Sequence, residues 1–420
     1  MDLKYRPGKD DLVCLFYFEL AKGMAVKEAV GRIASESSNG TWTSLSTLKE
    51  HIRKIRARAF EINGNYVKIA YPIELFELGS IPQLMSSVAG NIFGMKAVAN
   101  LKLLDISFPE KYLRSFKGPG FGMNGIRKVM AVSKRPLTCT VPKPKVGMTT
   151  NEHLNVARDA WTGGIDFLKD DENLTDQNFN KFYKRADLCF KLRDKIEKIT
   201  GERKSYFINV TAETNEMVKR AKHVADLGGE YVMIDFLTAG YSGFQTLRDF
   251  CHDHKLAIHV HRAMHAAFDR NPKHGISMLT LAKIVRLIGG DNLHIGTVVG
   301  KLVGSKSDVL MLKEGIVNQG IIAGQLNLSQ KWHGMKDMIP VSSGGLHPGL
   351  VPYIMNILGN NCVLQLGGGI HGHPNGTKYG AIALRQAIDA SLSKVNLTEY
   401  AKMHKELKIA LGKWGFEKPI

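Results

Sequence analysis

Residues 163–173 join an apolar run to a cluster of charged side chains. The segment reads GGIDFLKDDEN, so two glycines and a short strand-forming run precede Lys169, Asp171 and Glu172. A strand ending in polar residues is typical of a barrel strand that opens into an active site. Carboxylate oxygens suit a hard cation such as Mg²⁺, whereas Lys169 could join them only as a carbamate formed with carbon dioxide. The segment alone fits a solvated acidic turn equally well.

Lysines, histidines and glycine turns end most of the other apolar runs in the second part of the chain. Each is weak evidence alone, because such residues are more often solvated or structural. Their shared position after strands is what favours a site, since strand ends form one rim in a (β/α)₈ barrel. Glycine turns after the last two strands can offer backbone N–H groups to a phosphate. The residues are Lys143, Lys145, Asp235, His259, His261, Arg262, His294, Ser343, Gly344, Gly345, Gly367 and Gly368.

Residues 300–304, GKLVG, set Lys301 between two glycines. This spacing suits a hinged lid that carries a cation over a ligand, or else an ordinary loop with a surface lysine. A divalent cation held by carboxylates can polarise a carbonyl and stabilise an enediolate. Cations and glycine turns on opposite sides of the rim suit a substrate with two phosphates. The residues therefore predict metal-assisted enolisation of a phosphorylated sugar.

The elements that would position these residues form a (β/α)₈ TIM barrel, which we place at residues 118–420 together with C-terminal helices. Short apolar runs alternate there with amphipathic stretches such as residues 213–227 and 278–288. Eight such units fit this α/β fold. The predicted strands are residues 137–141, 165–168, 206–210, 231–236, 256–261, 292–296, 338–342 and 362–366.

Residues 1–117 predict a separate ferredoxin-like α+β domain. Strands are expected at residues 12–20, 56–62, 66–71 and 101–108, and helices at 25–35 and 81–88. Asn63-Gly64-Asn65 predicts a hairpin between the two middle strands. The glycine-rich residues 118–122 mark the boundary between the domains.

The net charge of +18 is compatible with nucleic acid, an anionic surface or an anionic substrate as partner. The densest basic run, residues 51–58, alternates with apolar residues and is interpreted as the solvated face of a strand. No nucleic-acid-binding motif accompanies it, so a basic nucleic-acid-binding protein is only the remote alternative. No apolar run is long enough to span a membrane. Five widely spaced cysteines fit a reducing cytoplasm.

Several motifs resemble the large subunit of ribulose-1,5-bisphosphate carboxylase/oxygenase (Rubisco). Residues 163–173 resemble its metal-site signature, and the family also has a small α+β domain followed by a (β/α)₈ barrel. The likeness extends over nearly the whole chain. The other motifs are ESSNGTW at 36–42, GNIFG at 90–94, KPKVG at 143–147, HVHRAMHA at 259–266, GTVVGKL at 296–302, SGG at 343–345 and LGGG at 366–369.

The resemblance implies carboxylation of ribulose 1,5-bisphosphate with carbon dioxide and water to two 3-phosphoglycerates, with competing oxygenation by O₂. Lys169, as the carbamate, would bind Mg²⁺ with Asp171 and Glu172 and would start formation of a Mg²⁺-stabilised enediolate. Lys143 would protonate the product carbanion. His261 would transfer protons near the C3 hydroxyl.

The resemblance also implies the substrate contacts. Lys301 would hold the incoming carboxylate and pair with Glu36, while Arg262 and His294 would bind one phosphate. The remaining contacts are Lys145 beside Lys143, Ser343 at a hydroxyl, Asn91 near the metal, and Thr41, Trp42, Gly345, Gly367 and Gly368 at the other phosphate, with Gly344 in the same turn.

Glu36, Thr41, Trp42 and Asn91 belong to the N-terminal domain, which in the family completes the site of the neighbouring subunit. The resemblance therefore implies a homodimer or higher homo-oligomer. The chain is shorter than plant-type large subunits and looks like the archaeal (form III-like) type. That type implies no small subunit and a role in salvaging nucleotide-derived (AMP-derived) ribose. A Rubisco-like enolase or isomerase is the alternative, but the catalytic residues that such relatives replace are all present.

Overall fold

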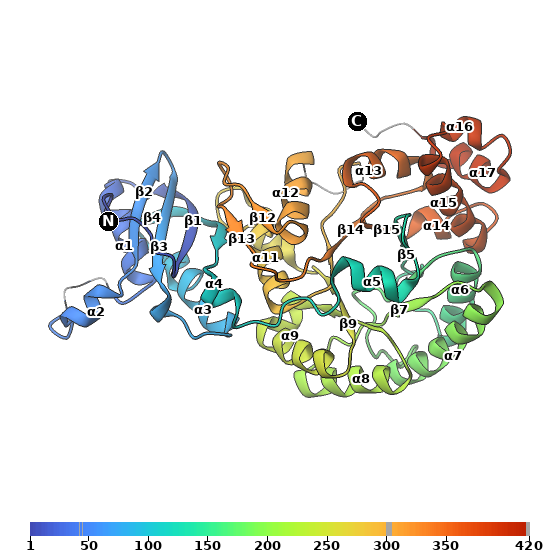
Figure 1. The fold of residues 1–420 in the computed structure, drawn as a ribbon, viewed down its shortest axis with the longest axis horizontal. Coiled ribbons are helices and arrows are strands. Elements are labelled where there is room, and N and C mark those ends of the chain that lie inside the picture. The colour runs from blue at the N-terminus through green and yellow to red at the C-terminus, as the bar shows by residue number, and fades with distance from the viewer. Residues whose placement is uncertain (42, 44, 300–304, 417–420) are drawn as a thin grey trace. The chain divides into compact units, whose positions relative to one another are not determined.

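The chain forms two compact units in this computed structural model, which describes residues 1–41, 43, 45–299 and 305–416 (Figure 1). The first unit comprises Met1–Gly118 with two later segments, Met264–Gly289 and Asn318–Met335. The second comprises Pro119–Ala263, Gly290–Val317 and Lys336–Ile420. Trp42 and Lys301, both predicted site residues, lie outside the described residues.

A mainly antiparallel sheet organises the first unit, in the order β10-β4-β1-β3-β2. The predicted strands and helices of the ferredoxin-like pattern are all present, so this part of the fold prediction is confirmed. In the β2–β3 hairpin Asn63 pairs with Tyr66, and Gly64 takes the positive φ of 56° that the tight turn requires. The elements are β1 (Asp11–Leu20), α1 (Val26–Glu36), α2 (Glu50–Lys54), β2 (Arg58–Asn63), β3 (Tyr66–Pro72), α3 (Ile81–Val88), β4 (Val98–Ser107), α4 (Glu110–Leu113), β10 (Gly275–Ile276) and α11 (Met278–Ile288).

The basic run at residues 51–58 is not the strand face that its alternation predicted. Residues 51–54 lie in the short helix α2, which buries none of its side chains, and only Arg58 belongs to a strand. Ile52 and Ile55 are three residues apart, so the same sequence also places them on one face of a helical turn. Over so few residues the period of a strand cannot be distinguished from that of a helix.

Lys283 and Asp105 form a fully buried ion pair inside the first unit. Lys283 Nζ on α11 lies 2.7 Å from Asp105 Oδ1 on β4, and the other oxygen of Asp105 accepts the N–H of Leu328 at 2.7 Å. Replacing Lys283 by methionine fills the space but leaves a buried carboxylate without its cation. We expect the variant to lose about 3–5 kcal/mol of stability, measurable as a lower urea midpoint. An unchanged midpoint would show that Asp105 is not left as an uncompensated buried charge when Lys283 is removed.

The second unit is a barrel of eight parallel strands, which confirms the predicted fold class. Its sheet runs β7-β6-β5-β15-β14-β11-β9-β8. A parallel bridge between Asn209 and Met233 links the two outer strands. The strands are β5 (Leu137–Thr140), β6 (Phe167–Lys169), β7 (Ser205–Phe207), β8 (Tyr231–Asp235), β9 (Ala257–His261), β11 (Asn292–His294), β14 (Ile339–Ser343) and β15 (Val363–Leu366).

Helix α5 (Gly122–Met130) closes the N-terminal end of this barrel. Its Ile126 and Met130 pack in one apolar cluster with the first residues of several strands, including Leu137 and Tyr231. The opposite, C-terminal ends are thereby left for chemistry. Helices surround the strands (Figure 1); they include α6 (Thr150–Thr162), α7 (Phe182–Thr200), α8 (Thr214–Asp226), α9 (Phe236–Asp253), α12 (Lys306–Val317), α13 (Val351–Leu358), α14 (Gly368–His371), α15 (Thr377–Leu392), α16 (Leu397–Tyr400) and α17 (Lys405–Trp414).

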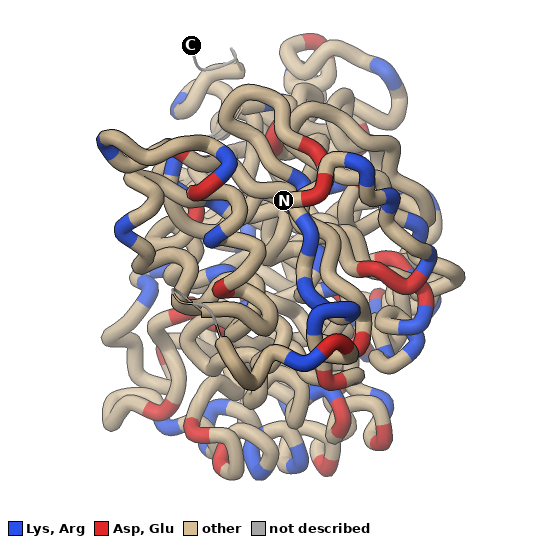
Figure 2. The backbone as a smooth tube through the Cα atoms, turned by 90° about the vertical axis from the view of Figure 1, so that its left-hand side faces the viewer, with Lys and Arg blue, Asp and Glu red and all other residues tan. Residues whose placement is uncertain are grey.

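Basic and acidic residues alternate along much of the chain, so the positive charge is not collected in one segment (Figure 2). This distribution gives the nucleic-acid alternative no support beyond the net charge itself. Among the described helices, none has both the length and the apolar character needed to cross a membrane.

Candidate active site at the barrel rim

The end of β6 carries Lys169, which is fully buried, and the chain then turns through Asp170, Asp171 and Glu172. Lys169 Nζ donates to the carbonyl of Asp170 at 2.8 Å and lies 4.0 Å from Glu172 Oε2. Side chains alternate in direction along an extended chain. The carboxylate of Asp170 accordingly bonds Arg185 and the backbone N–H of Asn209, apart from the group formed by its neighbours.

Lys143 contacts the second acid of this turn. Its Nζ donates to Asp171 Oδ2 at 2.9 Å, while Asp171 Oδ1 accepts the backbone N–H of Asn173 at 3.2 Å. Burial would raise the pKa of Asp171, but the hydrogen bond and charge of Lys143, together with the hydrogen bonds from Asn173, outweigh burial and hold the pKa below its ordinary value. Asp171 is therefore a carboxylate at neutral pH, next to an amine.

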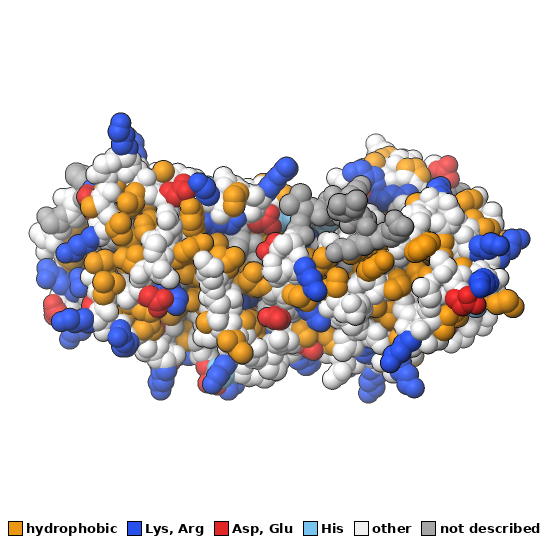
Figure 3. Space-filling view, turned by 90° about the horizontal axis from the view of Figure 1, so that it is seen from above, with side chains coloured by type: hydrophobic (Ala, Val, Ile, Leu, Met, Phe, Trp, Pro, Cys, Tyr) orange, Lys and Arg blue, Asp and Glu red, His pale blue; other side chains and the backbone are white. Residues whose placement is uncertain are grey.

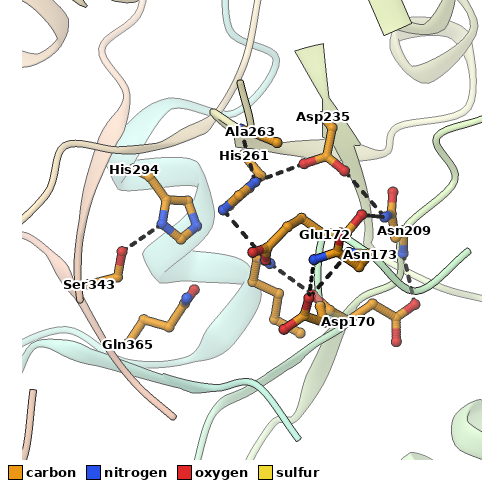
Figure 4. Close-up of polar contacts among 12 residues, drawn as sticks. Asp170, Glu172, Asn173, Asn209, Asp235, His261, Ala263, His294, Ser343 and Gln365 are labelled. Carbon is orange, nitrogen blue, oxygen red and sulfur yellow. Dashed lines mark hydrogen bonds and ion pairs between the residues drawn. The ribbon is translucent and has the colours of Figure 1, made fainter. Parts of the chain in front are cut away.

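His261, the last residue of β9, lies between two acids. Its Nδ1 is 2.8 Å from Asp235 Oδ1, and its Nε2 is 3.7 Å from Glu172 Oε2 (Figure 4). Asn209 Nδ2 donates to the other oxygen of Asp235 at 3.4 Å. The backbone N–H of Ala263 also donates to Nδ1, at 3.2 Å, so two partners hold the ring with its Nε2 toward Glu172.

His294 and His259 form a buried pair on the adjacent strands β11 and β9. Their Nε2 atoms are 2.9 Å apart, and His294 Nδ1 lies 2.8 Å from Ser343 Oγ. Burial, followed by nearby positive and imidazole groups, lowers the pKa of both rings well below the ordinary value. Both rings are therefore uncharged at neutral pH, and both nitrogens of His294 already have a partner, His259 and Ser343.

Glycines shape the rest of the rim. Gly296, at φ 85°, makes room for a guanidinium, because a Cβ there would lie 2.9 Å from Arg262 Nη2. Gly344 and Gly345 follow β14 with φ of 120° and 72°, a backbone that glycine adopts without strain. Gly367 and Gly368 follow β15 and begin the four-residue α14.

The predicted residues of the second unit thus come from separate strands and meet at one rim. Lys143, Lys169, Asp171, Glu172 and His261 are linked by the contacts above, and His294 and Ser343 adjoin them. Lys145 is exposed two residues after Lys143. Glu36 ends α1, Thr41 follows it, and Asn91 begins a 3₁₀ turn, all in the first unit.

The carboxylates at the rim offer part of the ligand set that a divalent cation needs. In the described part of the chain, no three His, Cys, Asp or Glu side chains are close enough together to hold a metal ion. Asp171 and Glu172 alone offer few oxygen ligands for Mg²⁺. A carbamate on Lys169, whose Nζ is already 4.0 Å from Glu172, would supply a third ligand of the right chemistry. Lys169, Asp171 and Glu172 therefore fit a Mg²⁺ ion if Lys169 is carbamylated.

Four residues of the site had no role assigned from the sequence: Asp170, Asn209, Asp235 and His259. Asp235 and His259 had a signal, since both are polar residues in apolar strands. Asn209 was hidden inside a predicted strand, and Asp170 was not distinguishable from the acids beside it.

One sizeable cavity, of about 920 Å³, lies in the first unit and does not coincide with this chemistry. It is lined by residues from β1, β4, α4 and the 320–333 segment, with Phe108 and Lys111 among them. None of the predicted site residues lines it. The side-chain chemistry of the chain is thus concentrated at the rim and not in this cavity.

Comparison with known proteins gave matches along the whole chain. Residues 1–112 match the family described as ribulose bisphosphate carboxylase large chain, N-terminal domain, and residues 122–414 match its catalytic domain. A ribulose bisphosphate carboxylase of Pyrococcus abyssi is 50% identical over 423 residues, covering 100% of this chain and 97% of the relative. One from Methanosarcina barkeri is 51% identical over 420 residues, covering 99% and 98%.

Solved structures give the same result. A dimeric archaeal Rubisco from Hyperthermus butylicus superposes with a TM-score of 0.94 at 46% identity, covering 99% of this chain and 98% of its own. An octameric Rubisco from Pyrococcus horikoshii superposes with a TM-score of 0.93 at 50% identity, covering 100% and 96%.

Proposed function

The chain belongs to the ribulose bisphosphate carboxylase large-chain family, and we infer that it is a ribulose bisphosphate carboxylase acting at the barrel rim. The observation that carries this conclusion for the chain itself is a group of five residues at the ends of three strands, linked by contacts of 2.9, 4.0 and 3.7 Å: Lys143, Lys169, Asp171, Glu172 and His261. The reaction joins carbon dioxide and water to the sugar and cleaves the C2–C3 bond, giving two 3-phosphoglycerates.

We propose that Mg²⁺ is held by Asp171, Glu172 and the carbamate of Lys169. When bound, the ion would polarise the substrate carbonyl and favour loss of the adjacent proton. Lys169 is fully buried at a strand end, so a carbamate there would be held on a rigid element. The pKa of Asp171 lies below its ordinary value, which keeps this ligand ionised.

His261 and Lys143 are proposed to move the protons. Asp235 holds the His261 ring at 2.8 Å and leaves Nε2 to exchange a proton near the C3 hydroxyl. Lys143 carries a proton on Nζ, 2.9 Å from Asp171, and would deliver it to the carbanion left at C2 after bond cleavage. The two groups approach the acidic turn from different strands, β9 and β5, so they can serve different carbons of one substrate.

The phosphates are proposed to bind on opposite sides of the rim. Arg262, with the neutral His294, would take one, and the turns at Gly345 and Gly367–Gly368 the other. Because His294 is neutral, the charge at the first phosphate comes from Arg262. Lys301 would hold the incoming carboxylate, and its pairing with Glu36 stays a prediction.

We further propose a homodimer or a larger assembly of dimers, with Glu36, Thr41, Trp42 and Asn91 acting in the neighbouring copy's site. Two observations support this: solved relatives are dimeric and octameric, and hydrophobic side chains reach the surface of both units (Figure 3). We propose the cytoplasm as its location, because the five cysteines are buried and unpaired. We also propose that O₂ competes with carbon dioxide in the reaction, that the enzyme acts in ribose salvage, and that it binds no small subunit.

Incorporation of labelled carbon dioxide into 3-phosphoglycerate tests this function. The purified chain should fix carbon dioxide onto ribulose 1,5-bisphosphate after incubation with Mg²⁺ and carbon dioxide. Exchange of the C3 proton without fixation would instead assign it to the enolase or isomerase alternative.

A further inference from the structure

Arg185, on α7, is buried beneath the acidic turn and bonds three groups at once. Its Nη2 lies 3.1 Å from Asp170 Oδ2 and donates to the carbonyl of Thr175 at 2.8 Å. Its Nη1 donates to the carbonyl of Asn180 at 2.7 Å. The side chain is completely inaccessible to solvent. One guanidinium therefore ties the residue after Lys169 to both halves of the loop that follows Glu172.

Asp170, the partner of Arg185, is surrounded by donors on the side away from the rim. The backbone N–H of Asn209 reaches its Oδ2 at 3.0 Å, and the hydroxyl of Tyr206 donates to its Oδ1. His153 Nε2 is 3.8 Å from the same oxygen. A buried carboxylate with this many partners cannot rotate without leaving several of them unpaired. Since Asp170 separates Lys169 from Asp171 in the chain, fixing Asp170 fixes the directions of both neighbours.

We propose that Arg185 is a positioning residue that sets the ligand geometry of Lys169, Asp171 and Glu172. The proposal rests on the proposed function, in which those three residues hold Mg²⁺. Arg185 touches neither the ion nor the substrate and acts only through Asp170 and the loop carbonyls. Partners of this kind orient metal ligands, and their loss typically costs metal affinity. The planar fork of arginine suits the task, because lysine offers only a single point of attachment.

Arg193 provides a matched control on the same helix. It lies two turns further along α7 and is also buried. Both guanidinium groups pack over a phenylalanine, Arg185 over Phe182 at 5.7 Å and Arg193 over Phe190 at 4.9 Å. The partners of Arg193, however, are Asp194, the carbonyl of Gly228 and Glu230, which precede β8 at the opposite end of the barrel. Removing either guanidinium damages the packing of α7, but only Arg185 reaches the acidic turn.

The test compares Arg185→Met with Arg193→Met and the unaltered enzyme. We measure the Mg²⁺ concentration that gives half-maximal activation at fixed carbon dioxide, the ¹³C NMR signal of the lysine carbamate, and KM for ribulose 1,5-bisphosphate. For Arg185→Met we expect about a 10–100-fold rise in the half-activating Mg²⁺ concentration and a weaker carbamate signal, with KM little changed once Mg²⁺ is saturating. Arg193→Met should match the unaltered enzyme in all three, whatever its thermal midpoint.

Arg185→Lys covers the case in which the methionine variant does not fold, because it keeps a cation beside Asp170. It should also need more Mg²⁺, since it loses the fork. An unaltered Mg²⁺ requirement in the folded Arg185→Lys or Arg185→Met variant, or an equal rise in Arg193→Met, would overturn the positioning role. Absence of a carbamate signal in the unaltered enzyme would instead count against the proposed metal site.

Discussion

Replacing Lys169 by alanine is expected to abolish carbon dioxide fixation while the barrel stays folded. The variant loses the buried amine proposed to become the carbamate, and with it the third oxygen ligand beside Asp171 and Glu172. Polarisation of a carbonyl by a metal ion is worth several kcal/mol, so fixation should fall on the order of 10³-fold or more. Fixation of labelled carbon dioxide, normalised to folded protein by circular dichroism, measures the loss.

Lys169→Met separates chemistry from packing in this experiment. Lys169 is fully buried, so alanine leaves a cavity that methionine fills. Both variants should be inactive, although the methionine variant should be the more stable. Lys204→Met is the matched control, because Lys204 is equally buried but bonds Glu202 at 2.7 Å before β7, at the other end of the barrel. Normal turnover by Lys169→Met would refute the assignment of Lys169 to the metal site.

The sequence predicts the fold and the rim well because both follow from strong local patterns. Eight apolar runs with polar residues at their ends are enough to order the barrel and to bring Lys143, Lys169 and His261 to one side of it. The pattern is weaker where neighbouring residues are chemically alike. The sequence around residues 169–172 holds three acids, and only the alternation of the folded chain turns Asp170 toward Arg185 and its neighbours toward the rim.

Interactions between distant segments could not be predicted in the same way. Asp235 and Asn209 meet His261 only because β7, β8 and β9 are adjacent around the barrel. The neutrality of His294 depends on its burial and on His259, which is 35 positions away in the chain. These contacts and pKa shifts depend on tertiary packing, whereas the hydrophobic periods of strands and helices can be read from neighbouring residues in the sequence. The basic run at residues 51–58 is too short for its secondary structure to be predicted, because the helical and the strand period fit it equally well.

Replacing Lys143 by methionine is expected to stop product formation while leaving proton exchange at C3. Methionine keeps most of the apolar stem but removes the amine that would protonate the C2 carbanion. General acid catalysis typically contributes about 10²–10⁴-fold, and fixation should fall by that factor. Wash-in of deuterium at C3 reports enolisation separately, and it should persist because Lys169 and His261 are intact.

The pH dependence of the remaining exchange gives a second, independent result for this variant. Burial tends to raise the pKa of Asp171, and the hydrogen bond and charge of Lys143, together with hydrogen bonds from Asn173, more than offset it. Without Lys143 the pKa rises, so on acidification Asp171 takes up its proton, and loses its capacity to bind Mg²⁺, at a higher pH than in the unaltered enzyme. C3 exchange should therefore decline earlier as the pH is lowered.

Lys222→Met serves as the control, because Lys222 forms an exposed contact of the same type with Asp226 at 2.7 Å on α8. Its fixation rate and its pH profile should both match the unaltered enzyme. Equal loss of exchange and fixation in Lys143→Met would mean that Lys143 acts before carbon dioxide adds, for example by orienting Asp171 for the metal. A shifted pH profile together with normal fixation would leave Lys143 as an electrostatic partner of Asp171 and would move the final proton donation to another group.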